Sequence, residues 1–234
     1  MCNRYGYQHP YQRLLEEFSR LGPINWDRLE PNEPRIDIRP TDRAPVIREG
    51  ADGSIELVDI RWGFIPPNWA GTVAAWQQSL KPKPGEQRSA NPMTNARAET
   101  IKTTTAYRDA YAQRRCLVPA SQYFEWSATS SDPKAKKTMF RFTVPAQPVF
   151  AFPGIWSRAR CAEDGIVDSF ALLTSAPGPD QAPYHNRQPV ILERNQWGEW
   201  LNPTKDLAPA FLGSPAGVIA VEYFSGPQPQ PTLF

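Results

Sequence analysis

Apolar residues recur at helical spacing in the first part of the chain. Between Tyr11 and Phe18 they stand at positions i, i+3, i+4 and i+7, which predicts a helix with one apolar face. Two further short helices are predicted at residues 105–113 and 197–201. No apolar run approaches the ~18 residues of a membrane span, so we expect these helices to pack on the core of a protein that does not cross a membrane.

Short apolar runs separated by turn residues make up most of the remaining chain. They predict strands, because they are brief and rich in β-branched and aromatic side chains. The predicted extended segments cover residues 35–47, 55–59, 116–118, 122–126, 139–144, 149–152, 169–174 and 217–222. Residues 78–93 and 127–138 are polar and are predicted to be loops. With no internal repeat and no long linker, we expect one α+β domain over residues 1–225 and a mobile tail at residues 226–234.

Composition supports this prediction and narrows the function. The chain has 234 residues, 40% of them hydrophobic, and its 26 prolines favour short strands and ordered loops over a helical bundle. A net charge of +2 is too small for a protein that coats duplex DNA, although arginines can still gather in one groove. The start has no apolar signal segment, so a cytoplasmic protein is expected. Cysteines and histidines are scattered singly and no phosphate-binding glycine loop is present, so we expect no metal and no cofactor.

Cys2 has the most distinctive chemistry. Removal of Met1 would leave one residue that carries both a free α-amine and a thiol. Such an aminothiol condenses with an aldehyde, because the amine forms an imine and the thiol then closes a thiazolidine ring. The amine has an unperturbed pKa of about 8, so a usable fraction is neutral at physiological pH. A small second residue is also common for no chemical reason, and the dipeptide alone leaves both interpretations open.

Polar side chains in two other segments are candidates for the same site. In an extended segment Asn95, Arg97 and Glu99 would share one face, opposite small alanines. Glu125 stands between two aromatic residues, where burial would raise its pKa into the range that suits proton transfer near neutral pH. A charged edge strand and an outward-facing glutamate would explain the same residues without chemistry.

A histidine, two arginines and a tryptophan complete this set. His185 and Arg187 would share a face of an extended segment, and a histidine titrates near ~6.5. Trp62 lies in a rigid loop of aromatic residues and prolines, where it either fills the core or offers a stacking surface to nucleotides. Arg4 lies two residues from Cys2 and is placed to hold a phosphate beside it. A structural histidine and a core tryptophan are the simpler interpretations.

Five motifs, taken in order, resemble the SOS-response-associated peptidase (SRAP) family. They are Met1–Tyr5, Arg61–Pro66, Asn95–Thr100, Arg115–Ala120 with Phe124-Glu125-Trp126, and His185–Val190. The resemblance extends from residue 2 to about residue 201. The chain departs from the family pattern at Asn3, where glycine is common, around Ser121-Gln122, at Gln188 and over residues 136–140. None of these departures removes a proposed catalytic residue.

The resemblance implies mixed or antiparallel, barrel-like sheets of short strands with a few helices. It implies an abasic-site sensor that forms a covalent thiazolidine crosslink between Cys2, freed of Met1, and the ring-opened deoxyribose in single-stranded DNA. By the same resemblance the catalytic residues are Cys2, Asn95, Glu125 and His185. The DNA contacts it implies are Arg4, Trp62, Arg97, Trp126 and Arg187. We expect a monomer that binds single strands or single-strand/duplex junctions.

Two other functions would use the same residues. An N-terminal-nucleophile cysteine peptidase would use Cys2, His185 and Glu125 on a peptide bond, its own or another chain's. The family is also credited with peptidase-like removal of its first methionine, so the enzyme class stays open between hydrolase and lyase. A non-covalent single-strand-binding module would leave Cys2 without a role.

Overall fold

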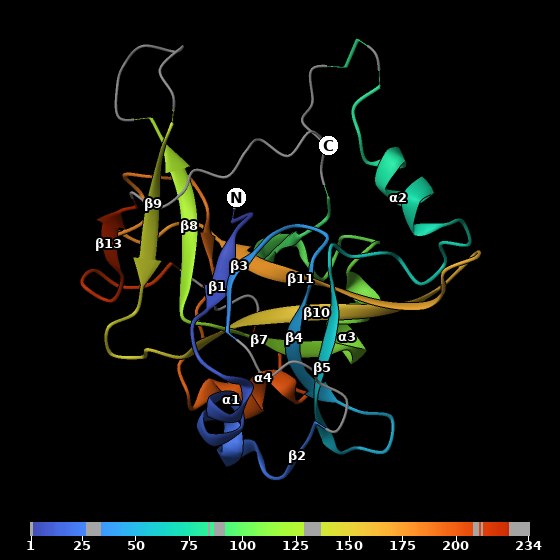
Figure 1. Cartoon of the computed structure of the whole chain (residues 1–234), viewed down its shortest axis with the longest axis horizontal. Coiled ribbons are helices and arrows are strands. Elements are labelled where there is room, and N and C mark those ends of the chain that lie inside the picture. The colour runs from blue at the N-terminus through green and yellow to red at the C-terminus, as the bar shows by residue number, and fades with distance from the viewer. Residues whose placement is uncertain are drawn as a thin grey trace.

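Two β-sheets organise the part of the chain that the structure describes (Figure 1). The computed structural model describes residues 2–26, 34–83, 85–86, 92–128, 137–207, 211 and 213–224. Its strands are β1 (Tyr5–Tyr7), β2 (Ile24–Asn25), β3 (Arg35–Ile38), β4 (Arg43–Glu49), β5 (Ile55–Trp62), β6 (Asn95–Arg97), β7 (Arg115–Ala120), β8 (Gln122–Ser127), β9 (Thr138–Thr143), β10 (Phe150–Cys161), β11 (Gly165–Ser175), β12 (Gln188–Pro189) and β13 (Ala220–Tyr223). The helices are α1 (Tyr11–Phe18), α2 (Val73–Ser79), α3 (Arg108–Gln113) and α4 (Gln196–Leu201), with 3-10 turns η1 (Ser19–Leu21) and η2 (Ala98–Thr100).

The larger sheet closes on itself. Its strand order is β12-β11-β10-β7-β4-β5-β2, and β6 adds to β11. β11 also pairs in parallel with β5, where Ser169 lies opposite Arg61 and Phe170 opposite Trp62. The strands β11, β10, β7, β4 and β5 therefore form a closed ring. Closure removes the unpaired edges that an open sheet would expose, and it confirms the barrel-like, mixed α+β architecture.

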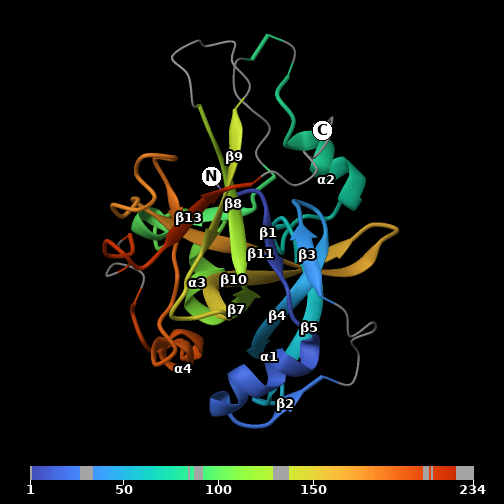
Figure 2. The same ribbon diagram turned by 60° about the vertical axis from the view of Figure 1, so that its left-hand side comes forward.

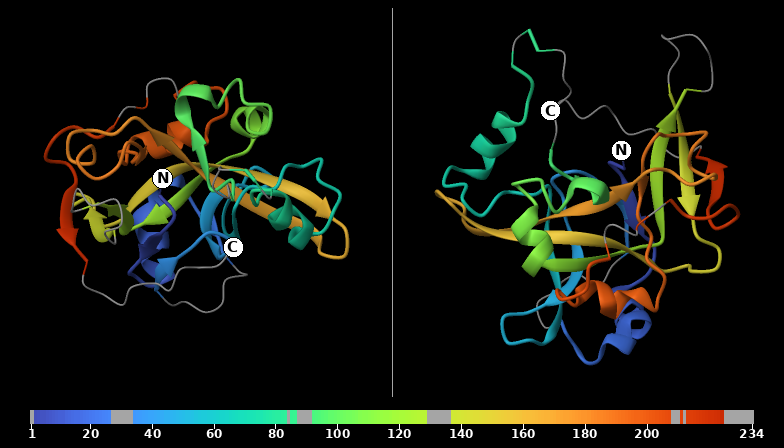
Figure 3. Two further views of the ribbon diagram at one scale, coloured as in Figure 1. Left: turned by 90° about the horizontal axis from the view of Figure 1, so that it is seen from above. Right: turned by 180° about the vertical axis from the view of Figure 1, so that it is seen from behind.

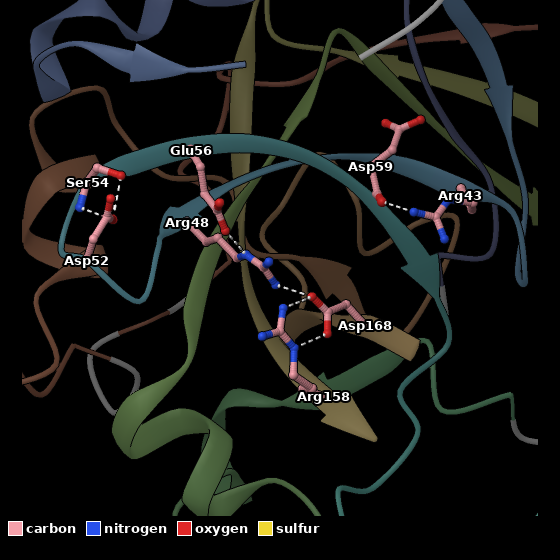
Figure 4. Close-up of polar contacts among 8 residues, drawn as sticks. All are labelled: Arg43, Arg48, Asp52, Ser54, Glu56, Asp59, Arg158 and Asp168. Carbon is pink, nitrogen blue, oxygen red and sulfur yellow. Dashed lines mark hydrogen bonds and ion pairs between the residues drawn. The ribbon is translucent and has the colours of Figure 1, made fainter. Parts of the chain in front are cut away.

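Ion pairs join the strands where the ring closes (Figure 4). The guanidinium of Arg48 on β4 donates to Glu56 on β5 at 2.6 Å and to Asp168 on β11 at 2.9 Å. Asp168 also accepts two hydrogen bonds from Arg158 on β10, both at 2.8 Å. Arg48 lies 4.0 Å from the centre of the Trp156 ring. Because one arginine links three strands, this network fixes their register as well as their proximity.

The smaller sheet has the order β13-β9-β8-β1-β3 and packs against the ring. Aromatic residues from both sheets share one core, in which Tyr5 meets Trp62 with ring centres 4.9 Å apart. A second core lies under α1 and α4, where Phe18 stacks on Trp197 at 4.0 Å. Both helices lie at the end of the molecule away from the N-terminus (Figure 2). Viewed from above, the N-terminus lies between the β8–β9 arm and the ring (Figure 3, left).

The sequence predicted α1 with its observed bounds, because its apolar stripe buries Tyr11, Leu14 and Phe18. It missed α2, which has no buried residue and therefore no apolar stripe, and it missed β1. Two predicted strands are much longer than expected, because β10 and β11 form one long hairpin whose far part packs in a third, small apolar cluster with Ile65. Parts of the predicted loops, at 84, 87–91 and 129–136, and the predicted tail lie outside the described residues.

Candidate active site around the N-terminus

The N-terminal segment runs into the core between the two sheets. β1 pairs with β8 and β3, and the backbone N–H of Phe124 donates to the carbonyl of Arg4 at 2.9 Å. Cys2 has none of its surface exposed, and its thiol donates to the same carbonyl at 3.5 Å. Burial, together with the negative charge of Glu125, holds the pKa of the Cys2 thiol well above its usual value. The thiol is therefore protonated near neutral pH, and a reaction must move its proton.

Asn95 reaches Cys2 from the larger sheet. Its side-chain nitrogen donates to the carbonyl oxygen of Cys2 at 2.9 Å, across 93 positions of sequence. β6 holds Asn95 in place by pairing with β11. Ala96 is buried and Arg97 exposed, as the predicted alternation of faces requires. The adjacent Glu99 lies in the η2 turn rather than in the strand.

Glu125 supplies a carboxyl group whose pKa lies near neutrality. It is 2% exposed, on β8 opposite Phe140 of β9. Burial raises its pKa from 4.5 to about 7, although the positive charge of Lys137 opposes the rise. The hydrogen bond from Phe124 to Arg4 sets β8 beside the N-terminal segment, and the negative charge of Glu125 raises the pKa of the Cys2 thiol. Near pH 7 the carboxyl is present in both forms and can give or take a proton. The predicted effect of burial on Glu125 is confirmed.

His185 is half-buried in the segment between β11 and β12. The backbone N–H of Arg187 donates to its Nδ1 at 2.9 Å, so the neutral ring carries its proton on Nε2. Burial lowers the pKa of His185, and the positive charges of Lys137 and Arg187 lower it further. The ring is therefore uncharged near pH 7 and able to accept a proton. Tyr184, next to His185 in sequence, packs against Phe140 with ring centres 4.7 Å apart, and Phe140 lies opposite Glu125 in the β8–β9 pair, so His185 and Glu125 share one neighbourhood.

The two arginines expected to hold phosphates have different surroundings. Arg97 is exposed at the surface next to Asn95. Arg187 donates two hydrogen bonds to the carboxylate of Glu99, at 2.7 and 2.9 Å, and another to the carbonyl of Thr174 at 2.7 Å. The guanidinium holds the pKa of Glu99 below its ordinary value, against a smaller opposing effect of burial. An anion that approaches Arg187 must share it with Glu99 or displace that carboxylate.

Two of the predicted DNA contacts are core residues in this structure. Arg4 is 6% exposed, and its guanidinium pairs with Asp37 at 2.7 Å, so it anchors the N-terminal segment. Trp62 is fully buried, and its indole N–H donates to the carbonyl of Thr94 at 3.0 Å. Neither presents a surface to DNA, because each is covered by segments distant in sequence. Trp126 is half-buried at the end of β8 and keeps part of its ring accessible.

Sequence reasoning missed Lys137 and Thr94. Lys137 lies in a segment interpreted as a loop, and only the β8–β9 pairing brings it near the site. Thr94 lies immediately before the Asn95–Thr100 motif, and its local sequence gives no sign of a role. Within the described residues, no three His, Cys, Asp or Glu side chains gather as metal ligands. No helix there is long and apolar enough to span a membrane.

Comparison with known proteins identifies the family of the chain. The model of the SOS response associated peptidase (SRAP) family matches residues 1–218. The chain belongs to this family. Among similar proteins, the abasic site processing protein YoqW of Bacillus subtilis is 29% identical over 218 residues, which are 92% of this chain and 85% of that protein. The abasic site processing protein YedK of Escherichia coli is 24% identical over 206 residues, 86% of this chain and 79% of that protein.

Solved structures share the SRAP fold. A crystal structure of a Bacteroides thetaiotaomicron protein superposes with a TM-score of 0.75 at 21% identity, covering 96% of this chain and 93% of that one. A Bordetella bronchiseptica protein superposes with a TM-score of 0.70 at 24% identity, covering 95% of this chain and 99% of that one. At these identities the likeness concerns the fold alone.

Proposed function

We propose that this SRAP protein captures abasic sites in single-stranded DNA covalently, through the amine and thiol of Cys2 after Met1 has been removed. The observation that carries the proposal is the convergence on Cys2 of the Asn95 amide and the Glu125 carboxyl, with His185 in the same neighbourhood. The similar proteins YoqW and YedK, both named abasic site processing proteins, support the choice of DNA lesion.

The reaction uses the aldehyde of the ring-opened deoxyribose. The α-amine of Cys2 attacks the C1′ carbonyl, and the resulting carbinolamine loses water to give an imine. The thiol sulfur then adds to C1′ while its proton passes to the imine nitrogen, which closes the thiazolidine. One water is released overall, and no oxidant or reductant is needed. The amine is available only once the Met1–Cys2 peptide bond has been broken.

Each of these side chains has a defined part in the reaction. Glu125, with a pKa of about 7, protonates the leaving hydroxyl of the carbinolamine and is reprotonated near neutral pH. Neutral His185 accepts the proton that the attacking amine sheds. Asn95 holds the carbonyl of Cys2, so amine and thiol face the lesion from a fixed backbone.

Single-stranded DNA containing an abasic nucleotide suits this site. The lesion has no base to unstack, so reaching the buried cysteine costs less than flipping an intact nucleotide. Arg97 is an exposed cation two residues from Asn95 and would bind a flanking phosphate. Arg187 would be a second phosphate contact when the carboxylate of Glu99 is displaced from it. Trp126 is half-buried at the end of β8, and we propose it as a stacking partner for a neighbouring base.

The test is a denaturing gel of protein incubated with a labelled single-stranded oligonucleotide that holds one abasic site. We expect a heat-stable shifted band for protein whose intact mass shows loss of Met1. Cys2→Ser is the matched control, because it keeps the α-amine but removes the thiol, and it should give no stable band. Cys2-dependent cleavage of a peptide without a shifted band would favour the peptidase. Salt-sensitive binding that ignores Cys2→Ser would favour a non-covalent binding module.

A further inference from the structure

Thr94 is the buried residue that joins the N-terminal segment to the larger sheet. It is 2% exposed, and its side-chain oxygen accepts a hydrogen bond from the Asn95 side-chain nitrogen at 3.0 Å. Its hydroxyl donates in turn to the side-chain oxygen of Asn3 at 3.3 Å. Asn95 uses the same nitrogen to hold the carbonyl of Cys2 at 2.9 Å. Thr94 and Asn95 thus hydrogen-bond to Asn3 and Cys2, and we call this pair of contacts the clamp.

The hydrogen bonds fix which way the Asn95 amide faces. A carbonyl oxygen such as that of Cys2 requires a donor, so the nitrogen of Asn95 must face it. The second hydrogen of that nitrogen goes to the hydroxyl of Thr94. The Asn95 side-chain oxygen is consequently turned the other way, and it is buried with no partner among the described residues. A buried acceptor left unpaired is costly, which is typical of a group that awaits a ligand or a reacting atom.

The backbone of Thr94 is itself held firmly. Its carbonyl oxygen accepts from the indole of Trp62 at 3.0 Å and from the backbone N–H of Leu172 at 2.8 Å. Trp62 and Leu172 are fully buried. The hydroxyl of Thr94 is therefore presented from a rigid part of the ring, and Trp62, expected from the sequence to contact DNA, serves to fix that position.

We infer that Thr94 is a positioning residue, whose hydroxyl orients the Asn95 amide and so fixes the backbone of Cys2 for attack on the aldehyde. The role in the reaction rests on the proposed function. The clamp on the N-terminal segment is a property of the fold alone. The two consequences can be measured separately.

The variants Thr94→Val and Thr94→Ser separate the hydroxyl from the shape of the side chain. Valine has nearly the same shape without a hydroxyl, whereas serine keeps the hydroxyl. In single-turnover crosslinking to an abasic oligonucleotide, the valine variant should lower the maximal rate by about three- to tenfold, the effect of one lost buried hydrogen bond. The protein concentration at half-maximal rate should not change. The serine variant should stay within about twofold of the parent in both quantities.

A second measurement needs no DNA. Iodoacetamide alkylation of the folded protein, followed by peptide mapping, gives the rate at Cys2 with buried Cys116 as internal control. Loss of the clamp should speed alkylation of Cys2 by about three- to tenfold in Thr94→Val, with no change at Cys116 or in Thr94→Ser. An unchanged alkylation rate of Cys2 in Thr94→Val would refute the inference that the Thr94 hydroxyl holds the N-terminal segment in place.

The outcomes distinguish the two proposals. If the parent protein forms no crosslink, the proposed function fails while the alkylation rates still decide the clamp. If the parent crosslinks but Thr94→Val crosslinks equally fast, the positioning role is wrong and the proposed function stands. Equal impairment of the valine and serine variants, or a shift in half-maximal concentration alone, would also refute positioning through the hydroxyl.

Discussion

Glu125→Gln should make the protein more stable while it slows the reaction. The carboxyl is 2% exposed, and burial raises its pKa from 4.5 to about 7. The folded state thus disfavours the ionised form, so stability is lost as the pH rises from the unfolded pKa of 4.5 to the folded pKa of about 7. Glutamine has the same shape and cannot ionise, so it removes this penalty. A residue that lowers stability yet is retained for chemistry is expected at an active site.

The size of the effect follows from the two pKa values. Stability from this group is fully present below pH 4.5, falls as the pH rises, and levels off above about 7. At 1.36 kcal/mol per pH unit, the total loss is about 3 kcal/mol, of which about 2.5 kcal/mol falls between pH 5 and pH 8. The stability difference between Glu125→Gln and the parent should grow by that amount over this range.

Urea unfolding at pH 5, 6, 7 and 8 measures this difference. With an m-value of about 2–3 kcal/mol/M, the gap between the two midpoints should widen by about 1 M urea. Both proteins must have the same N-terminus, checked by intact mass. Glu193→Gln, at an exposed position, controls for the loss of one charge. A gap that stays constant with pH would refute the raised pKa. A gap that narrows as the pH rises would show that the fold stabilises the anion.

Crosslinking by the same variant tests the role in catalysis. Glu125→Gln should slow crosslinking by about 10²-fold, the usual contribution of an acid–base group, with little loss of DNA affinity. The decline of the parent's rate above pH 7 should be absent in the variant. Equal losses in rate and affinity would assign Glu125 a structural role.

Three further outcomes are expected from contacts in the structure. Arg97→Ala should lower the slope of log affinity against log salt by about 0.7 and leave thiazolidine formation with a free aldehyde intact; an unchanged slope would remove Arg97 from the DNA contacts. Glu99→Gln should release Arg187 from its carboxylate partner. The affinity for single-stranded DNA should rise, and the slope of log affinity against log salt should steepen by about 0.7. Weaker binding would mean that Glu99 orients the arginine. Gly6→Ala should lower the free energy of unfolding, measured in urea, by about 2 kcal/mol or more, because the added Cβ would overlap a backbone carbonyl of β3. Gly198→Ala in α4 should raise the free energy of unfolding by about 0.5–1 kcal/mol, because its Cβ would meet no atom nearer than 3.9 Å. Equal effects of the two substitutions would contradict this.

The sequence by itself determined several of the elements and one chemical property. The stripe of α1 and the alternation around Asn95 depend only on which face is apolar, and that is written in local spacing. The raised pKa of Glu125 was predictable for a similar reason, since its neighbours along β8 are aromatic. The five motifs identified the family because their order and content are both visible in the chain.

Only the tertiary structure decided which of these residues meet. Local spacing does not say which distant segment covers a side chain, so it left Trp62 open between core and surface and suggested a phosphate contact for Arg4, whereas both side chains lie in the core. The partners that decide their roles are remote: Asp37 is 33 positions from Arg4, and Glu99 is 88 positions from Arg187. Closure of the ring through β5 and β11 brings Thr94 and Asn95 to the N-terminus. The clamp on Cys2 is therefore a product of strand pairing across the whole chain.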